Sequence, residues 1–482
     1  MIDEESLKNV NLPHSQPRIF AMQPAEHKSI LLTVDGVLVL LALLIGLWFG
    51  AQRSNWLFSL DLVLSYSIWF VGITAIYIVL ATVNNAYHPK VASDPVASFV
   101  AISKTVLQIF AIYLLIYALL PPWSLPRHFI GFFALISPFL LVGWRLLYSW
   151  AFKMTVFQQK AIIVGAGWAG KTIAKILNDH APSQFQLVGF VDDDPTKQHT
   201  KVEGALVLGS VDALPGLVQA HGVTDVVLAI TRDVPGHALS SLINCYERNV
   251  RISTMAELYE WLTDRVPVEH IGDNWFVVLP LSNRNQTLAY RVTKRMMDIV
   301  ISAVGLLLFA PLFPVLALLI KIDSSGPIFY RQKRVGRGGY VFELIKLRSM
   351  VVDAEKDGVA KWADFDDPRV TKVGRFLRQT RLDEVPQLFN VLRGEMSLIG
   401  PRPERPEFVQ ELEQEIPFYR TRLSVKPGLT GWAQVNYDYG RSAVDALEKL
   451  RYDLYYIKHQ SIHLDVIILL KTIGTVLMLR GT

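Results

Sequence analysis

The chain has 482 residues, of which 51% are hydrophobic, and its mean hydropathy is +0.30. Both values are high for a soluble protein and indicate membrane segments. The formal net charge is only +5 at a pI of about 9.0, which suits an anionic bilayer or substrate and argues against nucleic acid as a partner. The single cysteine, Cys245, excludes an internal disulfide framework and a cysteine metal site.

Residues 1–28 are polar and lack the charged start, apolar core and cleavage site of a signal peptide, so we expect a cytoplasmic N-terminal tail. Residues 29–153 contain four apolar segments, each long enough to cross a bilayer. The lysines and arginines that flank the set place both of its ends in the cytoplasm. The sequence therefore predicts a bundle of four transmembrane helices, lying roughly at 30–50, 57–83, 97–120 and 129–152.

Three ionisable residues, Asp35, Asp61 and Lys104, lie inside or near the ends of these segments. They could mark a polar path through the membrane, but we favour snorkelling at the interface or pairing between helices. We assign no chemistry to the four helices.

A Rossmann-like α/β domain is predicted over residues 154–285, where strand-like runs alternate with helical stretches. Gly165, Gly167 and Gly170 form a GxGxxG pattern after the first strand, and Asp192 follows at about the distance expected of a ribose-binding acid. Two interpretations stay open. The glycines could bind NAD or another nucleotide, or they could only permit tight packing of strand against helix, which we favour.

Residues 286–323 contain another apolar run, uncharged over 299–320 and long enough to span a bilayer. Pro311 and Pro314 lie near its middle, and each removes a backbone donor, which favours a sharp break. A helix that bends there and returns keeps its flanking basic residues together at the cytoplasmic headgroups. The sequence alone supports this re-entrant helix and a fifth, kinked spanning helix equally.

Residues 324–482 are basic and rich in glycine and proline turns. A strand, a basic glycine loop and a second strand are predicted first, and Arg334 is among the cations that such a loop can present to phosphate or to the membrane. Lys346 and Arg348 alternate along the second strand and so share one of its faces.

The segment 375–403 embeds two adjacent acids, Asp383 and Glu384, among arginines that include Arg378 and Arg402. A carboxylate can attack a phosphoryl group only if arginines or a divalent ion neutralise the incoming and departing charges. For an isolated acid pair, an ordinary solvated helix face is far more common. The surroundings must therefore decide between the two interpretations.

The last apolar stretch, SIHLDVIILLKTIGTVLMLR, predicts an amphipathic helix that Asp465 and Lys471 interrupt. These charges argue against a spanning helix. We favour a position in the membrane interface over packing on the domain.

From Lys294 to the end, the motifs KRMMD, SSGPIFYRQKRVG, FELIKLRSM, RLDEVPQLFNVLRGEMSLIGPRPERPEF and KPGLTGWAQVN occur in one order. This part resembles the bacterial sugar transferases, the monotopic polyprenyl-phosphate phosphoglycosyl transferases. The preceding helices and α/β domain resemble the large subfamily, which initiates exopolysaccharide, capsule or O-antigen assembly. The resemblance implies that 286–323 is a re-entrant membrane helix in front of a small cytoplasmic α/β catalytic domain.

The resemblance also implies a ping-pong reaction between a nucleoside diphosphate sugar, in this family usually a UDP-hexose, and undecaprenyl phosphate. Asp383 would attack the sugar-linked phosphate and expel UMP, while Glu384 would help hold an essential Mg²⁺ (magnesium). Leu347 stands where the family usually has phenylalanine, a change that should affect packing only. The family's basic residues around the phosphates correspond to Lys346, Arg348, Arg378 and Arg402. We expect these cations to lower the pKa of Asp383 and keep it ionised.

The expected setting is the bacterial inner membrane, with the catalytic domain on the cytoplasmic face. A homodimer and contacts with downstream glycosyltransferases would suit the large-subfamily architecture. One competing function is an NAD-dependent sugar-nucleotide dehydratase or epimerase, but its Y-x-x-x-K pair matches only Tyr290 and Lys294, outside the α/β domain, which we take as accidental. The other is a non-catalytic scaffold, against which the acid pair argues.

Overall fold

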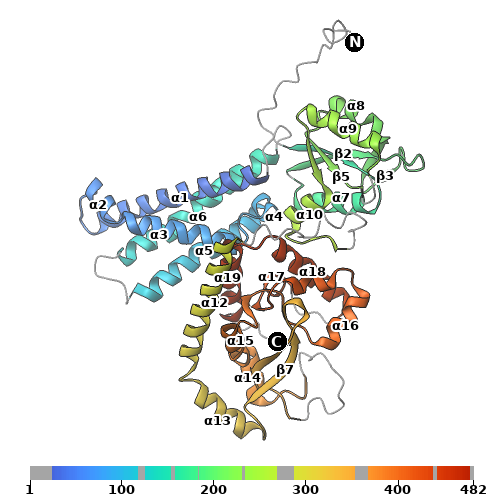
Figure 1. Cartoon of the computed structure of the whole chain (residues 1–482). Helices are drawn as coiled ribbons and strands as arrows, with labels where there is room; N and C mark the ends of the chain where they lie inside the picture. Colours follow the sequence, from blue (N-terminus) through green and yellow to red (C-terminus); the bar gives the residue numbers. More distant parts are fainter. Residues whose placement is uncertain are drawn as a thin grey trace.

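The computed structural model has three parts in chain order: a helical N-terminal part, an α/β domain and a C-terminal part (Figure 1). Residues 1–23 of the predicted N-terminal tail and residues 269–285 at the end of the predicted α/β domain lie outside the described residues, whereas residues 24–28 of that tail form the start of the first helix. The structure describes residues 24–117, 125–153, 158–182, 184–230, 234–268, 287–352, 367–437 and 442–477.

Four long helices form the N-terminal part and pack on a shared apolar core. Within the described residues, three of them are long and apolar enough to cross a membrane, and α3, with 17 residues, is shorter. The helices are α1 (Pro24–Arg53), α3 (Ser67–Val83), α5 (Pro95–Ile116) and α6 (Arg127–Lys153), with the short α2 (Leu60–Ser65) and α4 (Pro89–Ser93) between them.

The second predicted segment, 57–83, is not one helix, because α2 and α3 are separated at Tyr66. Tyr66 has φ −102° and ψ 5°, outside the helical region, and the hydroxyl of Ser67 donates to the carbonyl of Leu64 across the break. Local side-chain hydrogen bonds of this kind compete with the helix.

Asp35 and Arg145 pair across α1 and α6, with 2.6 Å between Oδ2 and Nη2, and both side chains are buried. Of the three interpretations of Asp35, the structure therefore shows pairing between helices. An unpaired charge inside an apolar bundle would be costly, and the pair also fixes how the two helices face each other.

The α/β domain is a six-stranded sheet with helices on both faces, as predicted. The strand order is β3-β4-β2-β1-β5-β6, and all neighbours are parallel except β3 and β4. The strands are β1 (Gln159–Val164), β2 (Phe185–Val191), β3 (Lys201–Val202), β4 (Ala205–Gly209), β5 (Asp225–Leu228) and β6 (Arg251–Thr254). Helices α7 (Trp168–His180) and α10 (Met255–Thr263) pack on one face, and α8 (Leu214–His221) and α9 (Gly236–Glu247) on the other.

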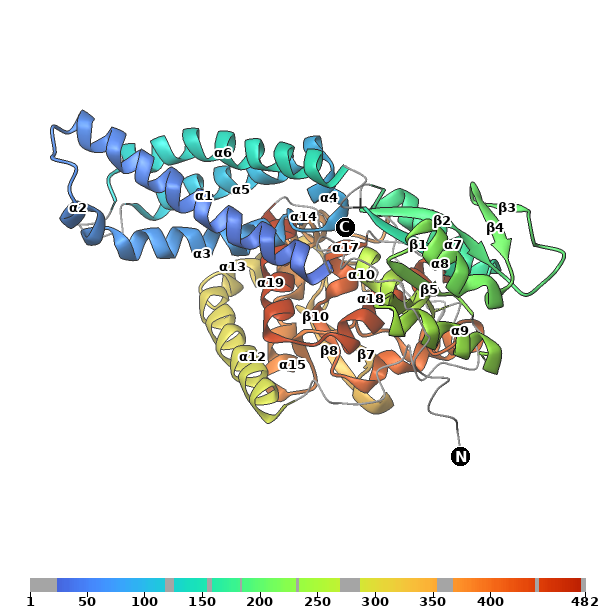
Figure 2. The same ribbon diagram turned by 90° about the horizontal axis from the view of Figure 1, so that it is seen from above.

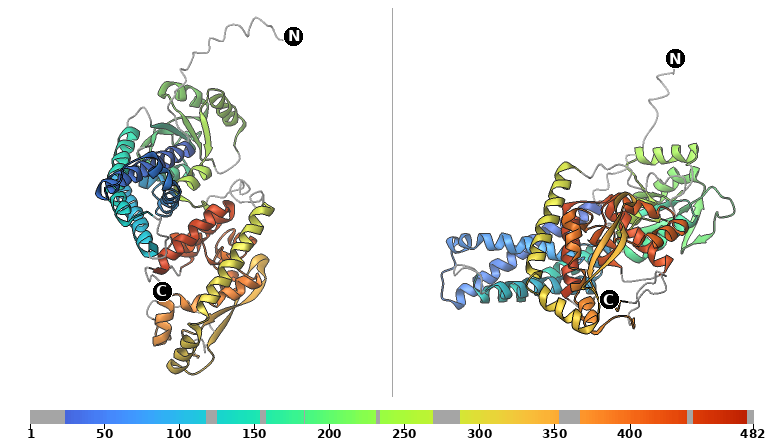
Figure 3. Two further views of the ribbon diagram at one scale, coloured as in Figure 1. Left: turned by 90° about the vertical axis from the view of Figure 1, so that its left-hand side faces the viewer. Right: turned by 60° about the horizontal axis from the view of Figure 1, so that its bottom comes forward.

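The predicted break in the apolar run is present. Helices α12 (Leu288–Phe309) and α13 (Phe313–Asp323) are bent by 64° relative to each other, with Pro311 between them and Pro314 in the first turn of α13. This pair, drawn in yellow, runs along one edge of the C-terminal part in Figure 1 and lies across the front of that part in the left-hand view of Figure 3. Asp298 ties α12 to that part, because its Oδ1 accepts from the amide of Leu398 at 2.9 Å.

The C-terminal part contains two small sheets among short helices. As predicted, a strand, a basic turn and a second strand form an antiparallel hairpin of β7 (Phe329–Val335) and β8 (Val341–Leu347). Strands β9 (Ser397–Ile399) and β10 (Gly428–Thr430) are parallel. The helices are α14 (Lys372–Gln379), α15 (Gln387–Arg393), α16 (Pro406–Glu415), α17 (Trp432–Asn436), α18 (Ala443–Lys458) and α19 (Ile462–Leu477).

The last helix, α19, packs on the domain, the less favoured of the two alternatives, and a position of its exposed face in the membrane interface stays a prediction. Its Asp465 is fully buried and accepts from Lys294 of α12 at 3.0 Å, while Leu464 and Ile468 join the domain core. Lys471 donates to Asn85 of the N-terminal part at 3.1 Å. The two charges that interrupt the apolar pattern are therefore contacts between parts of the fold.

Helix α10 connects the α/β domain to the C-terminal part, and it lies beside α18 in both Figure 1 and Figure 2. Glu260 of α10 pairs with Lys458 at 2.8 Å and with His459 at 3.1 Å. Just beyond the helix, Asp264 accepts from the hydroxyl of Tyr455 at 2.9 Å. These contacts fix α18 against the α/β domain.

Candidate active site

The two acids lie in a 3-10 turn, Leu382–Glu384, between α14 and α15. Helix α14 stops because Arg381 adopts a left-handed conformation, with φ +58°, and α15 begins after Pro386. The reversal turns both carboxylates inward, so that Asp383 is 6% and Glu384 9% exposed. The predicted helix, break and short helix are confirmed.

Glu384 is surrounded by cations. Its Oε1 lies 2.9 Å from the Nζ of Lys346 and 3.2 Å from Nη2 of Arg402, and its Oε2 lies 3.5 Å from Nη1 of Arg381. Burial disfavours the charged carboxylate, but the three cations outweigh burial and hold the pKa of Glu384 well below its usual range. Glu384 is therefore a carboxylate at any physiological pH.

Asp383 has different surroundings. Its Oδ1 is buried without a hydrogen-bond partner, and no ion pair reaches its carboxylate within the described residues. Burial is the main influence and raises its pKa to about 6, with the charge of Lys346 opposing it and that of Glu384 adding to it. The cations do lower this pKa as expected, since the charges of Lys346, Arg378 and Arg381 all favour the ionised carboxylate, but burial outweighs them and the net shift is upward.

Lys346 is held in place by Asn390, which the sequence analysis did not single out. The buried Asn390 amide of α15 accepts from the backbone N–H of Ile345 at 3.2 Å and donates to the carbonyl of Glu343 at 2.7 Å. These bonds hold β8, which carries Lys346, against α15, which follows the acids. An asparagine inside a short helix gives no sequence pattern that would reveal this role.

Lys346 lies in β8, whereas Arg348 follows the last residue of that strand, and their side chains diverge. The buried guanidinium of Arg348 donates to the carbonyls of Ser324 and Ser325 at 2.6 and 2.8 Å, just beyond the end of α13. Cations near a helix C-terminus satisfy its last carbonyls. The structure therefore does not bring Arg348 to the acids.

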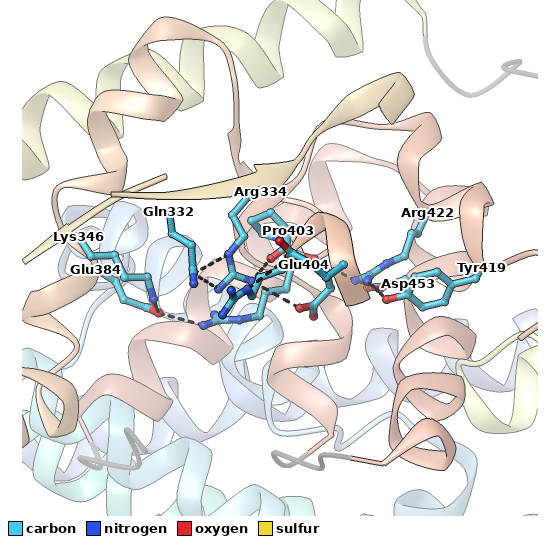
Figure 4. Close-up of polar contacts among 12 residues, drawn as sticks. Gln332, Arg334, Lys346, Glu384, Pro403, Glu404, Tyr419, Arg422 and Asp453 are labelled. Carbon is cyan, nitrogen blue, oxygen red and sulfur yellow. Dashed lines mark hydrogen bonds and ion pairs between the residues drawn. The ribbon is translucent and has the colours of Figure 1, made fainter. Parts of the chain in front are cut away.

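The other two predicted arginines differ from each other. Among the described residues, the guanidinium of Arg378 has no hydrogen-bond partner, but it lies close enough to Asp383 for its charge to favour the ionised carboxylate. Arg334 donates to the carbonyl of Pro403 at 2.9 Å and to Gln332 at 2.6 Å, as Figure 4 shows. It reaches the acids only through the turn that carries Arg402.

The described residues contain no group of three or more His, Cys, Asp or Glu that could hold a metal ion by themselves. Mg²⁺ commonly binds one or two carboxylates and completes its shell with water and substrate phosphates. The adjacent carboxylates of Asp383 and Glu384, with an unpartnered Oδ1, fit that kind of site.

Residues 289–479 match the family described as bacterial sugar transferase. A relative from Aeromonas hydrophila, UDP-N-acetylgalactosamine-undecaprenyl-phosphate N-acetylgalactosaminephosphotransferase, is 38% identical over 339 residues, which are 69% of this chain and 75% of the relative. The chain belongs to the bacterial sugar transferase family.

Two further relatives of this sugar transferase carry related names. The undecaprenyl-phosphate glucose phosphotransferase of Komagataeibacter xylinus is 36% identical over 65% of this chain and 58% of its own. The UDP-glucose:undecaprenyl-phosphate glucose-1-phosphate transferase of Escherichia coli (strain K12) is 43% identical over 42% of this chain and 43% of its own. The family members are enzymes, and so is this chain.

Two further comparisons match smaller parts of the sugar transferase. Residues 82–233 match the family described as CoA-binding domain. The solved structure of UDP-D-quinovosamine 4-dehydrogenase from Vibrio fischeri matches 20% of this chain and 77% of its own at 26% identity, with a TM-score of 0.18. A similarity this limited does not bear on the activity of the domain.

The glycine pattern of that domain serves packing at two of its three positions. Gly165 has φ +104°, and a Cβ on Gly170 would lie 2.0 Å from the carbonyl oxygen of Gly165. No atom lies within 4 Å of a Cβ on Gly167. Asp192 accepts from the backbone N–H of Ala166 at 2.7 Å, so its carboxylate already binds the glycine loop. Binding of NAD or another nucleotide there stays a prediction.

Proposed function

We propose that this sugar transferase moves a sugar 1-phosphate from a UDP-sugar to undecaprenyl phosphate through a covalent aspartyl-phosphosugar, releasing UMP. The observation that carries the proposal is the contrast within the acid pair. Glu384 is neutralised by Lys346, Arg402 and Arg381, whereas the Oδ1 of Asp383 is unpartnered. A nucleophile needs a lone pair that no donor occupies, and a charge-rich phosphoryl transfer needs cations beside it.

In the first step, an Oδ of Asp383 attacks the sugar-linked phosphorus of the donor. An aspartyl O–P bond forms, the bond from this phosphorus to the bridging oxygen breaks, and UMP leaves with the electron pair. A pKa of about 6 leaves Asp383 mostly ionised at neutral pH, yet more nucleophilic than an ordinary aspartate. Lys346, Arg402 and Arg378 supply positive charge around the phosphates.

In the second step, a phosphate oxygen of undecaprenyl phosphate attacks the same phosphorus. The aspartyl O–P bond breaks, and the Asp383 carboxylate returns with the electron pair while the diphosphate-linked sugar leaves. No water, oxidant or reductant takes part. The covalent intermediate lets the soluble donor leave before the lipid acceptor enters the same site.

A magnesium ion would be held by Glu384 and Asp383 together with phosphate oxygens of the substrate, and it would neutralise charge that develops on those oxygens. Glu384 already contacts three cations.

The site must lie where a soluble donor and a lipid acceptor can both reach it. We propose that the four N-terminal helices cross the bacterial inner membrane and that α12 and α13 form a re-entrant hairpin which returns to the cytoplasmic face. Large apolar side chains of the bent pair support this, because Leu307, Leu318 and Ile322 are 73%, 62% and 74% exposed.

The dehydratase or epimerase alternative gains no support. Tyr290 and Lys294 both donate to Asp465, so the Y-x-x-x-K pair is a contact between α12 and α19. The names of relatives include N-acetylgalactosamine, glucose and galactose as the sugar. We therefore propose these three UDP-sugars as the first donors to test, with exopolysaccharide, capsule or O-antigen synthesis as the pathway.

The experiment uses full-length protein in lipid nanodiscs with Mg²⁺ and each UDP-sugar, without acceptor. Intact mass spectrometry should show the addition of one phosphosugar, located on the peptide that contains Asp383 and removed by undecaprenyl phosphate. Asp383→Asn should show neither the adduct nor UMP release, whereas Asp445→Asn, at the cap of α18, should behave as wild type. Substantial UMP release by Asp383→Asn would overturn the assigned nucleophile.

A further inference from the structure

Three consecutive backbone carbonyls, at residues 402 to 404, are each held by a separate donor. The carbonyl of Arg402 accepts from Nη2 of Arg422 at 3.0 Å, and that of Pro403 accepts from Nη1 of Arg334 at 2.9 Å. The carbonyl of Glu404 accepts from the backbone N–H of Val335 at 2.9 Å. Guanidinium groups supply two of the three donors, so the turn is clamped from both sides (Figure 4).

Arg422 is itself fixed inside the protein. Its Nη2 lies 2.9 Å from Oδ2 of Asp453 on α18, and its Nη1 donates to the hydroxyl of Tyr419 at 2.6 Å. The side chains of Arg422 and Asp453 are 6% and 2% exposed. A buried ion pair gives little net stability against an apolar replacement, but this one fixes the position of the Arg422 side chain.

Arg402 joins this buried pair to the acids. Its carbonyl accepts from Arg422, while its own Nη2 lies 3.2 Å from Oε1 of Glu384. One residue is thus fixed through its backbone and acts on the acid pair through its side chain. The position of the Arg402 side chain matters, because a displacement of about 1 Å in a catalytic group can lower the rate about a hundredfold.

We infer that Asp453, Arg422 and Tyr419 are positioning residues that hold Arg402 against Glu384, and that Arg334 completes the same clamp. The inference rests on the proposed function, because it concerns how the cation beside the acid pair is presented. It gives Arg334 a role on the turn backbone in place of contact with substrate.

A double-mutant cycle tests the inference. In single-turnover UMP release, Asp453→Asn should lower the rate constant about tenfold or more while the donor concentration at half-maximal rate changes little. Arg402→Ala should lower it further. In the Arg402→Ala background, Asp453→Asn should have almost no additional effect, because the residue that it positions is gone. Effects that multiply in the double variant would overturn the inference.

Two variants separate positioning from loss of stability. Tyr419→Phe removes one hydroxyl and keeps the ring, so it should fold and show a smaller loss that again depends on Arg402. Asp225→Asn removes one charge of an ion pair with Arg251 in the α/β domain, 3.3 Å between Oδ1 and Nη1, and as a matched replacement of a buried aspartate far from the turn it should leave the rate constant unchanged. If the wild type releases no UMP, the proposed function itself is contradicted. If the wild type is active and the effects of Asp453→Asn and Arg402→Ala on the rate constant multiply, only this inference is contradicted.

Discussion

Asp383 and Glu384 are neighbours in one 3-10 turn, yet cations contact only the second. The Nζ of Lys346 lies 2.9 Å from Glu384, and burial raises the pKa of Asp383 to about 6. Environments that push the pKa values of two neighbouring carboxyl groups apart commonly give the two groups different catalytic roles. Here Glu384 stays ionised, whereas Asp383 gains or loses its proton near pH 6.

The first prediction concerns pH. The rate of UMP release in the absence of acceptor should rise with pH through about 6, because Asp383 must lose its proton to act as a nucleophile. At one unit below this pKa the rate should be about a tenth of its plateau. Single-turnover assays between pH 5 and pH 8 measure it, and a rate independent of pH over this range would contradict the prediction.

The raised pKa also has a consequence for stability. The folded-state pKa lies above the ordinary value of 3.8, so the stability that protonated Asp383 contributes is lost as pH rises through about 6. Asn resembles the protonated acid. Asp383→Asn should therefore raise the free energy of unfolding at pH 7.5 by about 1–3 kcal/mol. The gain should disappear near pH 4 in thermal unfolding, and a variant less stable than wild type at pH 7.5 would contradict the burial argument.

Arg381 combines a left-handed backbone with a contact to Glu384, and two variants separate these features. Arg381→Gly and Arg381→Ala both remove the cation and should lower the rate of UMP release equally. The glycine variant should be more stable by about 1 kcal/mol, because only alanine strains at φ +58°. Equal melting temperatures would show that the turn relaxes away from this conformation.

Arg348 should matter for the fold near the membrane and not for the donor. Arg348→Met leaves the carbonyls of Ser324 and Ser325 unsatisfied, which should cost about 2–3 kcal/mol of stability. The KM for the UDP-sugar should stay near that of wild type in the folded fraction. Lys346→Met is the matched comparison, and it should instead lower the rate of UMP release. A large rise in KM for Arg348→Met would return Arg348 to the substrate site.

The glycine pattern of the α/β domain allows a paired test. Gly170→Ala should destabilise the protein by about 2–3 kcal/mol, since its Cβ would meet the backbone of Gly165. Gly167→Ala should change stability by only about 0.5 kcal/mol, because its Cβ enters open space. Thermal unfolding with and without NAD or a UDP-sugar measures both. Stabilisation by a nucleotide that Gly167→Ala abolishes would reveal a binding site there.

Much of the fold could be predicted from local pattern. The GxGxxG strand-turn-helix, the proline break near Pro311 and the helix boundary before Pro386 all depend on backbone constraints that a few residues carry by themselves. The acid pair could also be predicted locally, because its arginines lie nearby in the sequence.

The pairing of specific charges could not be predicted in this way. Whether Lys346 binds Asp383 or Glu384 depends on the left-handed residue at 381, and the destination of Arg348 depends on where α13 ends. The clamp on the 402–404 turn joins residues from β7, α18 and the segment between α16 and β10. Contacts between distant segments of this kind leave no periodicity in a single sequence.

Helix α18 makes two contacts that are close in space, one with the α/β domain and one with the residues behind the active-site turn. Near its end, Lys458 is held by Glu260 of the α/β domain, and five residues earlier Asp453 holds Arg422 behind the turn of Arg402. Five residues of helix span only about 7.5 Å, and helices transmit a tilt along their length with little loss. The α/β domain therefore contacts the same helix that positions Arg402 beside the acids. We expect a reorientation of that domain to change the rate of phosphoryl transfer.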